Sequence, residues 1–200
     1  MKIQIIKIIA SFIAAAVVMI LHEFPKAYTY NLLSKDKNIK NKNNIYKVHH
    51  YIDPIGMLLC ITNVAGFSKP YMYRIKDKRT NLILGITGFL SLLGIFAISI
   101  IVIRFGLGMD SSLMYDTTAP IYIILLNHIA VYTASTSICM FIVNLFPIST
   151  FDMGLCIAGK SPAKYFAIIR NDYMLKMMLL LLVMFRLIPT VGVVIISQFL

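Results

Sequence analysis

The fold is decided first by residues 3–26, which read IQIIKIIASFIAAAVVMILHEFPK. Residues 3–21 are apolar at all but three positions, and a run of this kind approaches the ~20 residues that a helix needs to cross a bilayer. The basic start and apolar centre resemble a signal peptide. However, the apolar run leads straight into His22 and Glu23, so we expect an uncleaved first span.

The rest of the chain is also unusually apolar. Its 200 residues are 59% hydrophobic with a mean hydropathy of +0.82, well above the apolar share of a soluble domain. After the first span at about 3–22, three more runs are long enough to cross at 81–103, 120–147 and 173–200. The sequence therefore predicts one all-α domain over 1–200, a polytopic transmembrane helix bundle with about four spans.

Residues 52–67 are apolar but too short to cross, and they contain proline and glycine. The flanking stretches 26–50 and 68–80 are both rich in lysine and arginine. If 52–67 crossed the bilayer, one basic flank would lie on the wrong side, because basic loops stay in the cytoplasm. We therefore expect a re-entrant segment at 52–67 with both flanks cytoplasmic, and the loop 104–118 outside.

The net charge of +11 could indicate a nucleic-acid partner. Most basic residues, however, lie in short loops between apolar runs, where they set topology and contact anionic lipid headgroups. The expected partners therefore include the lipid bilayer and no nucleic acid. Cys60, Cys139 and Cys156 are widely spaced in apolar surroundings, so we interpret them as buried small residues.

His22-Glu23-Phe24-Pro25-Lys26 resembles the HExxH zinc motif with lysine at the second histidine position. In the intact motif, two histidines one helical turn apart hold zinc while the glutamate activates a water molecule. Lysine is an uncommon zinc ligand. Its ammonium can instead occupy the site as a replacement cation paired with carboxylates, without a metal.

A second polar motif, NLFPISTFDMG at residues 144–154, follows the run at 120–147. It ends on the side of the membrane that His22 reaches, so Asp152 is expected at about the depth of His22. A carboxylate there could be a third zinc ligand or could pair with a nearby lysine.

Together these motifs resemble those of the site-2 protease family of intramembrane zinc metalloproteases, in its compact bacterial form. That family carries HExxH on one span, N-x-x-P-x-x-x-x-D-G on a later one, and D-P-I-G followed by G-x-x-K-P between them. Residues 53–56 (DPIG) and 66–70 (GFSKP) match the intermediate elements in order and spacing. Residues 88–91 (GFLS) resemble the A-G-P-x-x-N element without its proline and asparagine, and the likeness covers roughly 8–185.

The resemblance implies that His22 and Asp152 are zinc ligands, that Glu23 is the catalytic general base, and that Asn144 lies near the bound peptide. Lys26 stands where the family has its second histidine, which leaves zinc two protein ligands instead of the three usual at catalytic sites. The resemblance thus implies zinc as the cofactor, although Lys26 opposes its binding. The resemblance to the compact bacterial form also implies that the protein lies in the bacterial cytoplasmic membrane.

Three functions remain open. The first is a degenerate pseudoprotease that binds a transmembrane peptide or partner membrane protein through the former substrate cleft. The second is an active zinc metalloendopeptidase with an unusual ligand set, and the third is a structural membrane subunit.

His49 and His50 could swing towards the site and supply the missing imidazole, or could form a solvated pair. His128 lies roughly 28 Å from the inner end of its span, at ~1.5 Å per residue, and cannot complete the site.

Overall fold

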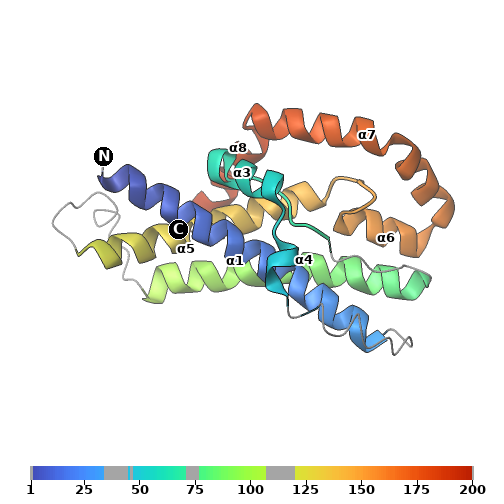
Figure 1. Cartoon of the computed structure of the whole chain (residues 1–200), viewed down its shortest axis with the longest axis horizontal. Coiled ribbons are helices and arrows are strands. Elements are labelled where there is room, and N and C mark those ends of the chain that lie inside the picture. Colours follow the sequence, from blue (N-terminus) through green and yellow to red (C-terminus); the bar gives the residue numbers. More distant parts are fainter. Residues whose placement is uncertain (1, 34–44, 46, 71–76, 107–119, 200) are drawn as a thin grey trace.

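The computed structural model describes residues 2–33, 45, 47–70, 77–106 and 120–199 (Figure 1). Every regular element in these ranges is helical, which confirms the predicted all-α class. The elements are α1 (Lys2–Leu33), η1 (Val48–Tyr51), α3 (Pro54–Asn63), α4 (Lys78–Ile101), the π-helical turn η2 (Val102–Gly106), α5 (Ile121–Asn144), α6 (Asp152–Lys160), α7 (Pro162–Met184) and α8 (Leu187–Ser197).

Three helical stretches in the described ranges are long and apolar enough to cross a membrane. They are Ile3–Leu33, Lys78–Phe105 and Ile121–Asn144. Helices α7 and α8, bent by 59° at their junction, pass the same test as a pair and count as a fourth span if they form one broken helix. The chain is therefore a membrane protein with three or four candidate spans, in agreement with the predicted number of about four.

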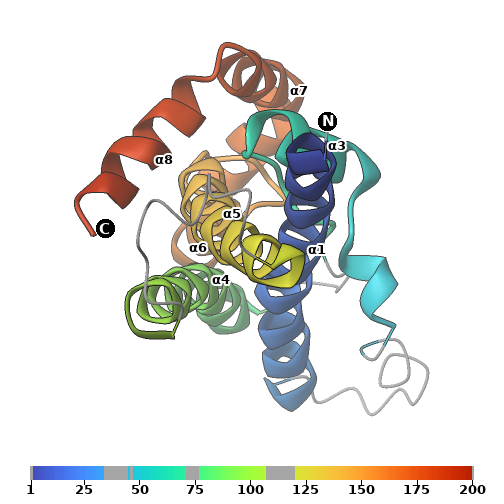
Figure 2. The same ribbon diagram turned by 90° about the vertical axis from the view of Figure 1, so that its left-hand side faces the viewer.

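The candidate spans α1, α4 and α5 pack against one another (Figures 1 and 2). Helices α1 and α5 run in the same direction and α4 runs in the opposite one, as consecutive crossings require. The predicted sidedness of the loops 34–50, 68–80 and 104–118 falls largely outside the described residues and stays a prediction.

Buried apolar side chains fill the contact between these helices. Ala15 and Met19 of α1, Leu92 of α4 and Met140 of α5 are fully buried in one cluster, which α3 also joins. Large apolar side chains such as that of Leu90 are exposed on the outside of the bundle. In a membrane these exposed side chains face lipid, so their exposure carries no penalty.

The last predicted span differs from the structure at its start. The sequence predicted a span at 173–200, whereas α7 begins at Pro162, a residue that favours the first helical turn because it has no backbone N–H to satisfy. The helix then ends near Arg186, which has a left-handed backbone conformation with φ of 59°. A break here fits the sequence, because Arg186 is charged in an otherwise apolar segment and Pro189 follows three positions later.

The predicted re-entrant segment contains one short helix. Helix α3 has 10 residues and is ~15 Å long, about half the thickness of the hydrocarbon core. Asp53 caps its first turn, and Val64 ends it in a left-handed conformation. The backbone N–H of Lys69 donates to the carbonyl oxygen of Tyr51 at 3.0 Å. The two ends of 52–67 therefore lie together, and the re-entrant position of this segment in a membrane stays a prediction.

Candidate functional site

One buried polar cluster joins three distant parts of the chain. Helix α1 supplies His22, Glu23 and Lys26, the connecting segment 65–70 supplies Ser68, and α6 supplies Asp152 as its first residue. The four charged or ionisable residues each expose 1% of their surface or less. The structure thus brings together the residues that the two sequence motifs singled out, while their chemical roles stay predictions.

Lys26 lies between the two carboxylates. Its Nζ donates to Oε1 of Glu23 at 2.7 Å and to Oδ1 of Asp152 at 2.9 Å. An isolated charge in such a place would cost several kcal/mol in lost hydration, so mutual pairing is what makes the burial of these groups tolerable. The ammonium therefore acts as the shared counter-ion of the cluster.

His22 completes the network from its two ring nitrogens. Its Nδ1 lies 2.9 Å from Oγ of Ser68, and its Nε2 lies 2.8 Å from Oδ2 of Asp152. Ser68 has one hydroxyl hydrogen and donates it to Oε1 of Glu23 at 2.7 Å, so its oxygen accepts from His22. Since ionised Asp152 also accepts, this pattern assigns a proton to both nitrogens. The cluster then holds two cations and two anions.

Asp152 begins a helix outside the candidate spans, and its surroundings favour the charged form. Burial raises the pKa of its carboxyl, but the charges and hydrogen bonds of Lys26 and His22 outweigh burial and hold the pKa at about 2. Because the pKa is lowered on folding, the stabilising contribution of this group is present above its ordinary value near 3.8 and is lost as the pH falls towards 2.

Asp152 reaches the cluster because neighbouring residues leave room for it. Asn144 fixes the preceding turn: its Nδ2 donates to the carbonyl of Met140 at 2.9 Å, and its Oδ1 accepts from the Asp152 N–H at 3.4 Å. On α4, a side chain at Gly88 would overlap the Asp152 carboxylate. Asn144 is buried and does not line the cavity that adjoins the cluster, between the segment 65–70 and α7. Its predicted contact with a bound peptide stays a prediction.

Glycines also position Ser68. A Cβ atom on Gly56 of α3 would collide with the carbonyl oxygen of Phe67, and one on Gly66 would collide with the carbonyl oxygen of Gly56. The connecting segment can therefore lie directly on α3, which places Ser68 beside α1. Sequence analysis gave Ser68 no role, although it stands inside the GFSKP element.

The donor set does not fit a catalytic zinc ion. In the part of the chain that the structure describes, no group of three or more His, Cys, Asp or Glu side chains is arranged to hold a metal. The Nε2 of His22 and Oδ2 of Asp152 are 2.8 Å apart, whereas two ligands of a tetrahedral zinc ion with bonds of ~2.0–2.1 Å lie about 3.3 Å apart. Lys26 also directs an ammonium, which has no lone pair, at the carboxylates.

The other histidines lie away from the cluster contacts. His49 and His50 are exposed in η1, and their ring centroids are 4.3 Å apart. Of the two predicted alternatives, a ligand supplied to the site or a solvated pair, the structure shows the solvated pair. His128 is buried in α5, where its Nδ1 lies 2.8 Å from the carbonyl oxygen of Ile124.

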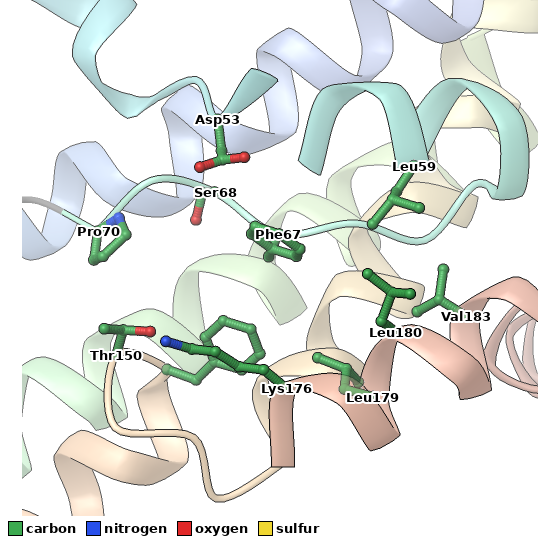
Figure 3. A pocket seen from close by; sticks show the side chains of 11 residues that line it. Asp53, Leu59, Phe67, Ser68, Pro70, Thr150, Lys176, Leu179, Leu180 and Val183 are labelled. Atoms are coloured by element: carbon green, nitrogen blue, oxygen red, sulfur yellow. The ribbon is translucent and has the colours of Figure 1, made fainter. Parts of the chain in front are cut away.

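A cavity of about 320 Å³ adjoins the cluster (Figure 3). It lies between the connecting segment, the turn before α6 and the face of α7, and Ser68 belongs to both its lining and the cluster. The wall is mainly apolar: Leu59, Phe67, Phe151, Leu179, Leu180 and Val183. Asp53, Thr150 and Lys176 contribute polar groups to the lining.

Comparison with known proteins gives no further guide to this site: no protein-family model, curated protein or solved structure matches the chain. The relation to site-2 proteases therefore rests on the ordered motifs and stays a proposal.

Replacing Lys26 by methionine should destabilise the protein strongly. The change keeps the length of the side chain but leaves Glu23 and Asp152 without their shared counter-ion, and breaking a buried pair in this way costs about 3–5 kcal/mol. Lys176→Met is the matched control, because Lys176 pairs with Asp172 while half exposed, and such pairs contribute about 0–1 kcal/mol. Thermal unfolding in detergent measures both. Equal melting of Lys26→Met and wild type would refute the buried network.

Gly88→Ala should also lower stability, since the added methyl group displaces the Asp152 carboxylate and overpacking costs about 1–3 kcal/mol. Gly94 lies on the same helix with open space around a Cβ position. Gly94→Ala should therefore be neutral or stabilising, by up to about 1 kcal/mol from helix propensity. If both variants melt alike, the close approach of α4 to Asp152 is wrong.

Proposed function

We propose that this protein is a degenerate member of the site-2 protease family that works without zinc and holds a transmembrane peptide or partner membrane protein in its former substrate cleft. The observation that carries the proposal is the position of Lys26, whose ammonium bridges Glu23 and Asp152. In the family the corresponding residues would be the general base and a metal ligand. Here both carboxylates are already engaged by a cation that belongs to the chain.

The binding part of the proposal rests on the cavity beside this cluster. Its mainly apolar lining suits apolar side chains of a membrane-embedded segment, and small-ligand pockets of about 300–1,000 Å³ typically combine such walls with a few polar groups. One wall is helix α7, most of whose surface is exposed outside the bundle core. A partner segment can therefore reach the cavity alongside α7.

Metal content tests the first half of the proposal. Detergent-purified wild-type protein should hold well under one equivalent of zinc, because His22 and Asp152 bond to each other and Lys26 adds positive charge. Lys26→His should raise zinc content by restoring three ligands, and Lys26→His with Asp152→Ala should lose it again. Elemental mass spectrometry gives the stoichiometry. One equivalent of zinc in wild type, removed by Asp152→Ala, would overturn the metal-free proposal and restore the alternative of an active metalloprotease.

Site-specific photocrosslinking in native membranes tests the second half. A photoreactive residue at Leu180, which lines the cavity, should yield adducts whose mass-spectrometric peptides come from membrane-embedded protein segments. The same residue at Leu90, on the exposed face of α4, should react mainly with lipid. Lipid adducts alone at both positions would contradict a peptide-binding cleft.

A further inference from the structure

Ser68, His22 and Asp152 are connected as a serine, a histidine and an aspartate. Oγ of Ser68 lies 2.9 Å from Nδ1 of His22, and Nε2 of the same ring lies 2.8 Å from Oδ2 of Asp152. The Ser68 hydroxyl donates to Oε1 of Glu23 at 2.7 Å, which is the contact that a nucleophile makes with its general base. In the serine-protease arrangement the imidazole accepts the serine proton, whereas here the ring donates to Ser68 and the Glu23 carboxylate takes the place of the base.

The serine is also placed where a substrate could meet it. Ser68 belongs to the cavity lining, and Figure 3 shows its side chain directed into the space between the connecting segment and Lys176 of α7. The other members of the cluster, His22, Glu23, Lys26 and Asp152, are absent from that lining. Ser68 is therefore the point at which the charged network meets the apolar cavity.

We propose that Ser68 is a nucleophile for metal-independent acyl transfer, and that the cavity takes a carboxylic ester with an apolar acyl group. The proposal rests on the metal-free state of the cluster described above. It extends that function, because a site without zinc hydrolysis would still carry a reactive hydroxyl.

The charges around Ser68 allow a balanced reaction. As Oγ of Ser68 bonds to the ester carbonyl carbon, its proton passes to the Glu23 carboxylate, 2.7 Å away. The ester C–O bond breaks, and Glu23 returns the proton to the leaving alkoxide to release an alcohol. A water molecule then attacks the acyl group on Ser68, gives its proton to Glu23, and releases the carboxylic acid as Ser68 recovers its hydrogen. Throughout, the Nδ1–H of His22 remains bonded to Oγ of Ser68 and stabilises negative charge on it.

The cavity lining selects the substrate class. The apolar side chains named above would contact the acyl chain, while Lys176, at the cavity, can face a polar or anionic part of the substrate. A volume of about 320 Å³ limits the acyl group to a short or medium chain.

A fluorophosphonate probe with an alkyl chain tests the proposal on the full-length protein in detergent. The probe bonds covalently to activated serine hydroxyls with loss of fluoride, so wild type should gain one adduct per chain, mapped by peptide mass spectrometry to Ser68. Ser68→Ala should gain none, and Glu23→Gln should react at least about 100-fold more slowly, the lower end of general-base contributions. Ser135→Ala is the control, since Ser135 bonds to a carbonyl of its own helix, and it should label like wild type.

The outcomes separate this proposal from the proposed function. Wild type that stays unlabelled, or that is labelled at another residue, overturns the nucleophile assignment, whatever the zinc content. Labelling of Ser68 that persists in the presence of a zinc chelator supports it. If labelling requires stoichiometric bound zinc, both the metal-free function and the present proposal are wrong. Unchanged labelling of Glu23→Gln overturns the proton-transfer step.

Discussion

The bridge from the Lys26 ammonium to the carboxylates of Glu23 and Asp152 is the interaction on which the rest of the structure depends. It joins α1 to α6 across 126 positions of the sequence, inside a bundle where unpaired charges are very costly. Two conditions make it possible. Gly88 leaves space for Asp152, and the contact of Gly56 with the connecting segment brings Ser68 to the cluster. Together the protonated Lys26 and His22 supply two positive charges, the charge that a zinc ion would bring.

Much of the fold could be predicted from hydrophobic length alone. A bilayer requires long apolar helices, so α1, α4 and α5 follow from their runs, and the break near Arg186 follows from a charged residue close to a proline in an apolar segment. The start of α7 could not be predicted in this way. Its first half, from Pro162, contains many polar and aromatic residues, and nothing in its hydropathy distinguishes a helix from a loop.

Part of the site could be predicted, because the position of each motif at the end of a span predicts the depth of its residues in the membrane. His22 and Asp152 were each expected at the inner end of a span, and two groups at one depth in a small bundle have few places to lie. Ser68 could not be found in this way, because its position depends on how closely two glycines let the connecting segment approach α3. Gly88 was interpreted as the remnant of a lost motif. The packing of α4 on α6 gives it a steric function that sequence spacing does not reveal.

A cation that is covalently part of the chain has no binding equilibrium, unlike a bound metal ion. A protein that binds zinc gains stability in proportion to RT ln(1 + [Zn]/Kd), so it weakens when the supply of metal falls. The Lys26 ammonium cannot dissociate, because it is covalently part of the chain. It is therefore present at one equivalent from the moment the chain is synthesised. If the proposed metal-free function holds, the assembled state of this site is independent of metal supply.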